Sequence, residues 1–354
     1  MRRPTVATSN LALVGFGNVG RALARLLLAK QDELRSRYGV EWSVTAIFTG
    51  KHGSTIDPSG IPLPQALHLS KAGASLEGLG KMASGKPFGE ALLESRAQVV
   101  FEMTPLSPDA GEPAISHIEA ALQLQLDAVT ANKGAVVFGF RKLTELARRN
   151  GRRFLFESTV LDGAPVFSLF RETLPATQLL GFRGILNSTT NFILTEMERG
   201  KSLEQAVREA QDRGIAEADP AADIDGWDAA FKVSALATVL MGQDLLPSQV
   251  ERQGIRGLSG EEVRRARSEG LPYKLVCSAE LGPRGIQASV HPERVPLSDP
   301  LAWVAGTSSS LHLRTDTLTG LTVTEHEPGP ATSAFGLLAD WLRIVRPAFS
   351  LFGG

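Results

Sequence analysis

The feature that most constrains the fold is a glycine-rich turn close to the start of the chain. Residues 11–16 form a short apolar run that breaks into Gly15-Phe16-Gly17-Asn18-Val19-Gly20. The apolar residues that follow have the spacing of an amphipathic helix: Val19, Ala22, Leu23, Leu26 and Leu27. A strand, a glycine turn and a helix suit a dinucleotide, because glycines let the backbone approach the pyrophosphate and the helix N-terminus attracts its charge. The alternative is a merely tight strand-to-helix turn.

The rest of the first half continues the alternation of strands and helices. After a helix that runs on through the charged residues 30–37, we expect strands at 43–48, 97–103, 127–130 and 154–157, helices at 115–124 and 141–149, and loops with one or two short helices over 57–89. This order predicts an α/β fold with a doubly wound, Rossmann-type domain over residues 1–156. A last helix, within residues 328–354, returns to complete it.

The pattern changes in the second half, over residues 157–327. Short extended segments are expected at 179–186, 286–291, 302–306, 310–315 and 321–325, with helices between them. Strands mixed with helices in this way predict a second, α+β domain with an open sheet that carries its helices on one face. We expect this domain to bind the substrate and to form the dimer contact.

Two lysines lie where the first sheet would bind its ligand. NAD-selective sites usually place an acid after the second strand, but residues 49–53 read Thr-Gly-Lys-His-Gly, and Lys51 is suited to a 2′-phosphate. This favours NADP weakly, since Lys51 is equally interpretable as a solvated loop residue. Lys133 follows the strand at 127–130, at the carboxyl edge where such sheets bind ligands. Its alternative is a solvated turn lysine.

An acidic stretch, residues 210–232, is the densest chemical feature of the second half. Five carboxylates fall within twelve residues, and one lysine closes the stretch: Glu217, Asp219, Asp223, Asp225, Asp228 and Lys232. A capping box at Ser202–Gln205 opens a helix before it, and Gly214 ends that helix. A helix from Trp227 would bring Asp228 and Lys232, four residues apart, onto one face.

Each acid of the stretch has a structural interpretation beside the chemical one. Asp219 and Asp225 each precede an expected helix, so capping alone accounts for them. Asp228 with Lys232 could be a surface ion pair, but the residues around them are almost all apolar, which favours a lysine that lines a pocket. The role of Asp223 stays open between these two groups.

Composition excludes several classes of protein. With 354 residues the chain can hold two domains, and 37 Lys+Arg against 38 Asp+Glu leave no basic field for nucleic acid. The one cysteine, Cys277, cannot form an intrachain disulfide, the start of the chain lacks a secretory pattern, and the apolar segments are too short to span a membrane. We therefore expect a cytoplasmic protein with a small-molecule partner.

The acidic stretch resembles the homoserine dehydrogenase signature. Eleven of its residues fall in register: Ala210, Gly214, Ile215, Ala216, Asp219, Pro220, Asp223, Ile224, Gly226, Asp228 and Lys232. Further blocks that look like the family occur in the expected order at 15–20, 129–134, 157–165, 184–194 and 329–338. The resemblance thus covers most of the chain. It implies reversible oxidation of L-homoserine to L-aspartate 4-semialdehyde with NAD(P), in the pathway to threonine and methionine.

The resemblance also implies a role for particular residues. Lys232 would be the proton donor and acceptor, with Lys133 beside the reacting centre. The substrate would be held by Glu217, Asp228, Asp223 and Thr189. The cofactor, NADP or NAD, would contact Gly15, Phe16, Gly17, Asn18, Val19, Gly20, Lys51, Thr104, Lys133, Gly214 and Gly329. A monovalent cation such as sodium or potassium would be bound by Glu157, Val160, Asp162 and Ala164.

The chain departs from the family pattern in a few places. Leu161-Asp162 stands where many members have Gly-Ala, which adds a carboxylate beside the cation loop, and Ser188 replaces a common glycine. We expect a homodimer without the C-terminal regulatory domain that some members carry. The competing functions are a related oxidoreductase for another small amino acid and a catalytically silent dinucleotide-sensing regulator. The retained acids argue against the first, and Lys232 with the lack of a basic helix-turn-helix argues against the second.

Overall fold

The computed structural model describes residues 7–81 and 86–346, which divide into two compact units. The first unit comprises Met1–Gly163 and Gly329–Gly354, and the second comprises Ala164–Pro328. Residues 157–163, which we expected to open the second domain, therefore group with the first. Within the described residues, no helix combines the length and the apolar character needed to cross a membrane.

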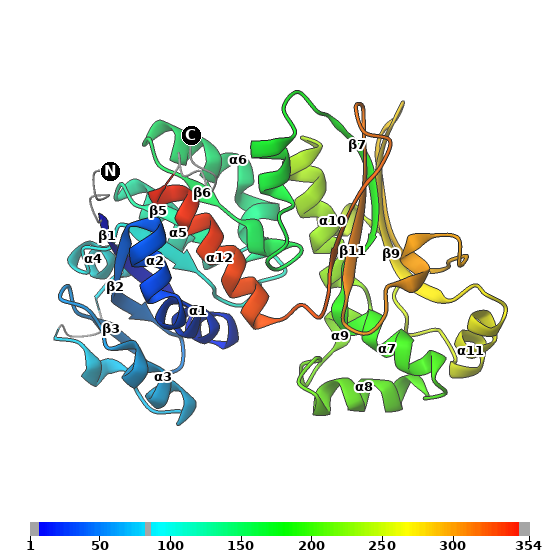
Figure 1. Ribbon diagram of the computed structural model, residues 1–354, viewed down its shortest axis with the longest axis horizontal. Coiled ribbons are helices and arrows are strands. Elements are labelled where there is room, and N and C mark those ends of the chain that lie inside the picture. The colour runs from blue at the N-terminus through cyan, green and yellow to red at the C-terminus, as the bar shows by residue number, and fades with distance from the viewer. Residues whose placement is uncertain (1–6, 82–85, 347–354) are drawn as a thin grey trace. The chain divides into compact units, whose positions relative to one another are not determined.

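The first unit is built on a six-stranded sheet in the order β3-β2-β1-β4-β5-β6 (Figure 1). All neighbours are parallel except β3, which runs antiparallel to β2. The strands are β1 (Ala7–Val14), β2 (Val40–Phe48), β3 (Ser54–Ile56), β4 (Val99–Glu102), β5 (Asp127–Thr130) and β6 (Phe154–Leu155). The chain order reverses between β1 and β4, which makes their carboxyl ends the switch point where open α/β sheets bind ligands.

Alternation along β1 gives this sheet two apolar faces. Leu11 and Leu13 face one core and Ala12 and Val14 face another, because successive side chains of a strand point in opposite directions. The helices of the unit are α1 (Asn18–Ala29), α2 (Gln31–Tyr38), α3 (Leu63–Lys71), α4 (Phe88–Glu94), α5 (Ala114–Gln123), α6 (Lys133–Arg149) and α12 (Pro330–Val345), with the 3-10 turns η1 (Glu77–Leu79) and η2 (Glu157–Thr159). Helices α1, α3 and α12 contribute to the Leu11 side and α4 and α5 to the Ala12 side, so the sheet is doubly wound, as predicted.

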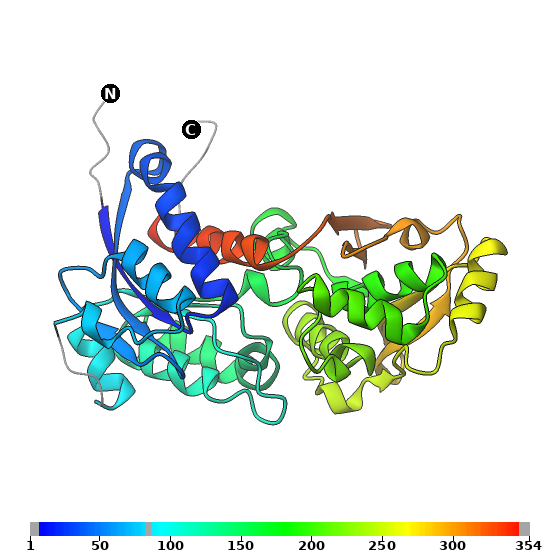
Figure 2. The ribbon, with the colours of Figure 1, turned by 90° about the horizontal axis from the view of Figure 1, so that it is seen from below.

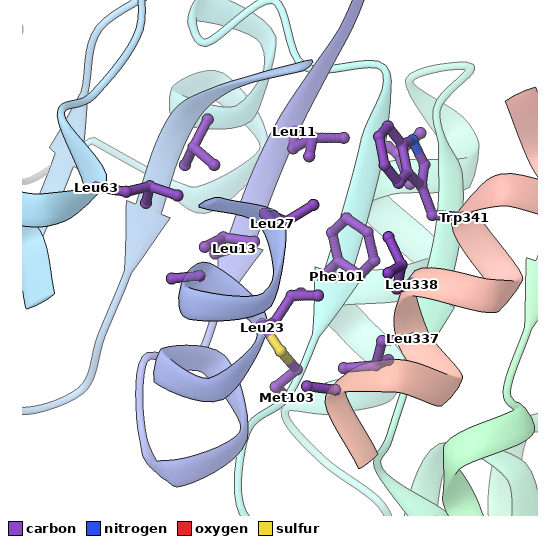
Figure 3. Packing of buried hydrophobic residues seen from close by; sticks show 14 of the residues in the cluster. Leu11, Leu13, Leu23, Leu27, Leu63, Phe101, Met103, Leu337, Leu338 and Trp341 are labelled. Carbon is purple, nitrogen blue, oxygen red and sulfur yellow. The ribbon is translucent and has the colours of Figure 1, made fainter. Parts of the chain in front are cut away.

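The last described helix, α12, returns to the first unit. It lies beside α1 in both ribbon views (Figures 1 and 2). Figure 3 shows Leu337, Leu338 and Trp341 pointing into the cluster that also holds Leu11 and Phe101. Trp341 is fully buried, and its indole N–H donates to Ser9 Oγ at 3.2 Å. Burial of an aromatic side chain of this size stabilises a fold by roughly 2–3 kcal/mol, so α12 is an integral part of this core.

The second unit is built on a second six-stranded sheet, in the order β12-β11-β7-β9-β10-β8. Its neighbours are antiparallel except β10 and β8. The strands are β7 (Leu179–Ile185), β8 (Glu251–Arg252), β9 (Tyr273–Gly282), β10 (Gly285–Arg294), β11 (Ser309–Thr315) and β12 (Leu321–Glu325). The helices are α7 (Ser188–Glu198), α8 (Leu203–Asp212), α9 (Ala221–Ile224), α10 (Trp227–Leu240) and α11 (Gly260–Ser268), with the short turns η3 (Leu169–Thr173), η4 (Pro247–Gln249) and η5 (Pro300–Trp303). Both α7 and α10 pack on β9, as an α+β domain predicts.

Several element boundaries differ from the prediction. The first helix ends at Ala29, and the charged residues after Lys30 form a separate helix, α2. Helix α6 begins at Lys133 rather than near residue 141, because Asn132 caps it by accepting from the N–H of Gly134 at 2.9 Å. The strand expected at 302–306 is wrong: Asp299 caps a 3-10 turn, η5, at Pro300. The strands β3, β8 and β9 were not predicted, and residues 82–85, inside the expected loop region, lie outside the described residues.

Candidate active site

The glycine turn between β1 and α1 has the backbone that close approach requires. Gly15 has a φ of +95°, in the left-handed region, and a Cβ there would lie 2.5 Å from the carbonyl oxygen of Met103. A Cβ at Gly20 would lie 2.4 Å from the carbonyl oxygen of Gly15. At Gly17, by contrast, a Cβ would meet nothing within 4 Å among the described residues. Gly17 is the N-cap of α1, so this open side of the turn faces the N–H groups that attract an anion.

The other residues of the turn differ in their surroundings. Phe16 is buried and belongs to the core of the first unit, so its side chain serves packing and its backbone lines the turn. Val19 packs against the same core. Asn18 is exposed, and its Oδ1 accepts from Arg21 Nη2 at 2.8 Å. Arg21 therefore brings a positive charge to the first turn of α1.

The turn after β2 carries charges of both signs. Thr49 holds this turn together, since its hydroxyl donates to the carbonyl oxygen of Gly53 and accepts from the N–H of His52, both at 2.8 Å. Lys51 lies at its exposed side. Glu77 of η1 reaches the same turn, because a Cβ at Gly53 would lie 2.7 Å from Glu77 Oε1. The sequence showed no acid in this turn because the carboxylate comes from a later segment.

The carboxyl ends of β4 and β5 are joined by polar side chains. Glu102 is fully buried and accepts from Thr104 N at 3.2 Å, from the Thr104 hydroxyl, and from Thr130 Oγ1 at 3.2 Å. Asn132 Nδ2 donates to the carbonyl oxygens of Thr104 at 3.0 Å and Pro105 at 3.2 Å. Lys133 follows as the half-buried first residue of α6. These contacts fix Thr104, one expected cofactor residue, and the other, Lys133, directly follows Asn132 in the chain.

The last cofactor candidates are glycines in two different units. Gly214 follows α8 in the second unit with a φ of +69°, as predicted for a residue that ends a helix. Gly329 is the N-cap of α12 in the first unit, where its N–H donates to Thr332 Oγ1 at 2.8 Å. A Cβ at either position would meet nothing within 4 Å among the described residues, so packing against those residues does not require glycine there.

Asn187 organises the acidic cluster of the second unit. It is the N-cap of α7, and its Oδ1 accepts from the N–H and the hydroxyl of Thr190, both at 2.8 Å. Its Nδ2 donates to Asp223 Oδ1 at 2.7 Å and to Asp228 Oδ2 at 2.9 Å. One amide thus holds two carboxylates from α9 and α10 side by side.

The two carboxylates sit in an environment that opposes a second negative charge. Burial raises the pKa of Asp223 above its ordinary value of 3.8, and the charge of Asp228 raises it further. Hydrogen bonds from Asn187 and Thr189 and the charge of Lys232 act in the opposite direction. Thr189 is buried on α7 beside this cluster. Asp223, which the sequence left unplaced, therefore belongs with Asp228.

Lys232 completes the cluster. Its Nζ lies 3.4 Å from Asp228 Oδ2, one helical turn earlier on α10, and donates to the carbonyl oxygen of Leu186 at 2.6 Å. Only 15% of the Lys232 side chain and 20% of the Asp228 side chain are exposed. The surface ion pair considered from the sequence is therefore wrong. A largely buried lysine beside a carboxylate can exchange a proton with a bound alcohol or aldehyde.

The remaining acids of the stretch lie outside the cluster. Glu217 is exposed on the loop after α8, and its carbonyl oxygen accepts from Gln211 Nε2 at 3.3 Å. Pro220, and not Asp219 as predicted, is the N-cap of α9, although Asp219 Oδ1 accepts from the N–H of Ala221, the first residue of that helix, at 3.1 Å. The cap expected at Asp225 is wrong: Gly226, with a φ of +81°, is the N-cap of α10, and Asp225 pairs with Arg256 at 2.8 and 3.0 Å.

The expected cation loop follows β6. Glu157 is buried, its N–H donates to Asp340 Oδ2 at 2.7 Å, and its Oε2 lies 3.8 Å from Arg343 Nη1. Asp162 Oδ1 accepts from Ser333 Oγ at 2.7 Å. Val160 is buried in the first unit, and Ala164 is the first residue of the second unit. The residues that the structure describes contain no group of three or more His, Cys, Asp or Glu side chains able to hold a metal ion.

Sequence reasoning missed three side chains that the structure brings to these sites: Asn187, Glu102 and Glu77. Asn187 stands directly before a helix in Asn-Ser-Thr-Thr, and this N-cap pattern is the signal that could have found it. Glu102 and Glu77 carry no local signal, because both meet their partners through the sheet and its loops.

Comparisons with known proteins agree with this arrangement. The model of a family described as homoserine dehydrogenase, NAD binding domain, matches residues 15–157, and the model described as homoserine dehydrogenase matches residues 165–342. The NAD(+)-dependent homoserine dehydrogenase of Pseudomonas canavaninivorans is 34% identical over 342 residues, 96% of each chain. The homoserine dehydrogenase of Methanocaldococcus jannaschii is 34% identical over 336 residues, 95% of this chain and 98% of its own.

Solved structures give the same result. A hyperthermophilic archaeal homoserine dehydrogenase mutant in complex with NADPH matches with a TM-score of 0.81 at 28% identity, covering 98% of this chain and 100% of that one. The homoserine dehydrogenase of Thiobacillus denitrificans matches with a TM-score of 0.79 at 27% identity, covering 96% of this chain and 74% of that one. With a dinucleotide-type turn in one unit and an acid–lysine cluster in the other, this chain belongs to the homoserine dehydrogenase family.

Proposed function

We propose that this chain interconverts L-homoserine and L-aspartate 4-semialdehyde, with Lys232 as the residue that moves the proton. Family membership makes it an NAD(P)-binding oxidoreductase that acts on the alcohol group of homoserine. The observation that carries the residue assignment is the position of Lys232 Nζ, held between Asp228 and the Leu186 carbonyl in the second unit. The bound dinucleotide supplies or accepts the hydride.

The substrate would be held by charge complementarity. Homoserine carries an ammonium group, to which Asp223 offers the opposite charge, and Glu217, on the exposed loop after α8, would add a second one. Asp228, beside Lys232, would face the hydroxyl end of the substrate. In the oxidation the amine form of Lys232 takes the hydroxyl proton, and in the reduction the ammonium form returns it to the aldehyde oxygen. Lys133, at the start of α6, is the second lysine that we assign to the reacting centre.

The proton-transfer role is tested by removing the lysine. Lys232→Ala is expected to lower the homoserine-dependent change in nicotinamide absorbance by about 100- to 10,000-fold in kcat, with cofactor binding retained. Lys201→Ala is a matched control, since Lys201 also pairs with an acid in the second unit but lies outside the cluster. Near wild-type turnover of Lys232→Ala would transfer the role to Lys133 or to water.

The cofactor would bind over the glycine turn. The open space at Gly17 supports this, because a Cβ there would meet nothing within 4 Å among the described residues and Gly17 stands at the N-terminus of α1, which attracts an anion. Gly17→Asp fits without a clash and adds a negative charge at the N-terminus of α1. We expect it to weaken cofactor binding by more than about tenfold with little change in thermal stability. Unchanged affinity for both NAD and NADP would contradict this site.

The preference between the two cofactors would be set by Lys51 against Glu77. Lys51 favours the 2′-phosphate of NADP, and Glu77 favours the free ribose hydroxyls of NAD. We expect both cofactors to be used, with NADP weakly preferred. Lys51→Ala should raise the KM for NADP more than the KM for NAD, and Glu77→Gln should do the reverse. If each substitution changes the KM for NADP and the KM for NAD equally, Lys51 and Glu77 do not set the cofactor preference.

A monovalent cation would be bound by residues 157–164. Glu157 and Asp162 offer carboxylates, and Val160 and Ala164 offer carbonyl oxygens, which are donors suited to hard cations. Arg343 already supplies part of the positive charge near Glu157. Initial rates in potassium, sodium and choline chloride at one ionic strength test this proposal. Equal rates in all three salts would contradict it.

A homodimer through the sheet of the second unit is the assembly that we propose. The face of β9 and β10 that points away from buried Cys277 carries Ser278 and Ser289, which are partly exposed and bonded to each other at 2.9 Å. Light scattering after gel filtration should give twice the mass of one chain. The mass of a single chain would contradict the proposal.

A further inference from the structure

Glu102 is a fully buried carboxylate for which the activity so far gives no role. It ends β4, with none of its surface exposed. A buried carboxylate destabilises a fold unless donors surround it. The donors here are the N–H and the hydroxyl of Thr104 and the hydroxyl of Thr130, while His117 Nδ1 lies 3.5 Å from Oε1. The polar contacts of Glu102 thus centre on the ends of β4 and β5.

These contacts lie at the switch point of the sheet. The glycine turn packs on the segment after β4, since a Cβ at Gly15 would lie 2.5 Å from the Met103 carbonyl oxygen and 3.0 Å from Thr104 N. A dinucleotide over this turn puts its adenosine ribose at the end of β2. Its other half, the nicotinamide riboside, must then extend toward the ends of β4 and β5, where Thr104 lies.

Glu102 determines which hydrogen bonds Thr104 can make. The hydroxyl proton of Thr104 is donated to Glu102, and so is its backbone N–H. A hydroxyl has one proton and two lone pairs, so the half-buried Thr104 hydroxyl can offer a ligand only an acceptor. The Thr130 hydroxyl accepts from Asn132 N at 2.9 Å, and its proton lies between two acceptors of Glu102, the backbone carbonyl oxygen at 3.0 Å and Oε2 at 3.2 Å.

We propose that Glu102 is a positioning residue that fixes Thr104 as a hydrogen-bond acceptor for the amino group of the nicotinamide carboxamide. The inference rests on the proposed placement of the cofactor over the glycine turn. Glu102 acts through Thr104 and does not itself touch the cofactor. A leucine in its place would remove the acceptor and leave the Thr104 hydroxyl proton to turn toward the ligand. A glutamine would keep an amide oxygen on Thr104, because Thr130 can donate to the backbone carbonyl oxygen of residue 102 at 3.0 Å.

The test compares Glu102→Leu with the wild type. We expect its KM for the nicotinamide cofactor to rise by roughly tenfold, the effect of losing one hydrogen bond that a charge supports, with the KM for homoserine unchanged. Glu102→Gln keeps an acceptor for Thr104 and should retain most of the wild-type cofactor KM. With the 3-acetylpyridine analogue of the cofactor, which lacks the amino donor, Glu102→Leu and the wild type should have the same KM. Asp57→Asn is the matched control, because Asp57 is a buried carboxylate of the same unit that bonds to Ser59.

Each result decides the proposal. An unchanged cofactor KM in Glu102→Leu, even with a lower Tm, would overturn it, and so would a tenfold penalty that persists with the analogue. If Glu102→Leu does not fold, Thr104→Val carries the same comparison, because it removes the acceptor and leaves Glu102 in place. The Gly17→Asp variant separates the two proposals. If Gly17→Asp binds the cofactor more weakly but Glu102→Leu leaves the cofactor KM unchanged, only the role of Glu102 is rejected. If Gly17→Asp binds the cofactor as tightly as the wild type, the placement of the cofactor over the glycine turn is rejected.

Discussion

At the scale of single residues, the acidic cluster shows a conflict between stability and binding. Asp223 and Asp228 are held together by Asn187, although burial and mutual repulsion disfavour the charge on Asp223. A site that must attract an ammonium group needs this negative charge, so the conflict is expected where substrate binds. The contrast with Asp225, which pairs with exposed Arg256, shows that acids three residues apart can serve different purposes.

The pH dependence of stability tests this conflict. The folded pKa of Asp223 lies above its ordinary value of 3.8, so the folded state holds the proton more tightly than the unfolded state. The stability linked to this proton is present below about pH 4 and is lost as the pH rises through the folded pKa. Asp223→Asn should therefore raise the Tm more at pH 8 than at pH 4, while the KM for homoserine rises by roughly tenfold.

The control for this prediction is Asp219→Asn, which keeps a side-chain acceptor for the N–H of Ala221 in the same segment. Its Tm should follow that of the wild type at both pH values. A Tm for Asp223→Asn that falls equally at pH 4 and pH 8 would show that the carboxylate supports the fold instead of opposing it.

At the scale of elements, helix α6 is the link between the sheet and a proposed catalytic lysine. Its N-cap, Asn132, is buried, accepts from Gly134 N, and donates to the loop after β4. Lys133 is the next residue, so the Asn132 side chain that caps α6 also sets the backbone position of this lysine. A helix cap also organises the acidic stretch. Asn187, the N-cap of α7, donates to Asp223 of α9 and to Asp228 of α10.

Asn132→Ala tests the link between the cap and the cofactor site. We expect the free energy of unfolding to fall by about 1–2 kcal/mol from the lost cap. The KM for the cofactor should also rise, because the loop that holds Thr104 loses two bonds. Asn150→Ala is the control at the other end of α6, where Asn150 donates to the Leu122 carbonyl at 2.8 Å. It should cost stability without changing the cofactor KM, and equal kinetic effects of the two variants would contradict the link.

At the scale of the whole molecule, the first unit is discontinuous in sequence. The chain leaves it at residue 163 and returns at residue 329. Contacts within the unit join the two ends: Ser158 Oγ donates to the Ser333 carbonyl oxygen at 2.8 Å, and Ser333 Oγ donates to Asp162. The dinucleotide-type sheet therefore depends on a helix that follows the second unit in the chain, through the burial of Trp341.

Trp341→Ala should destabilise the first unit by about 3–5 kcal/mol. Loss of cofactor binding on heating reports on this unit. Cys277 reports on the second unit, since complete burial raises the pKa of its thiol to about 12 and protects it from alkylation. We expect weaker cofactor binding with Cys277 still protected. Trp303→Ala, at an exposed tryptophan, is the control and should change neither signal. Fast alkylation of Cys277 in Trp341→Ala would show that the two units unfold together.

Local patterns predicted much of this protein and failed in identifiable places. The capping box at Ser202, the terminator at Gly214 and the strand at 127–130 were predicted as observed, because each is set by neighbours in the chain. Strand β9 was missed and η5 was misread: β9 is buried between its neighbour β10 and β7, which lies far earlier in the chain, and η5 packs on β9.

The sequence by itself determined the glycine turn, the two-part organisation and the helical spacing that places Asp228 beside Lys232. These follow from backbone sterics and from the periods of helices and strands, which act over a few residues. Only the tertiary structure decided that Asn187 joins Asp223 to Asp228, that Glu77 reaches the turn after β2, and that Glu102 holds Thr104. Such contacts join segments far apart in the chain, and no local pattern specifies them, because they exist only once two cores have formed.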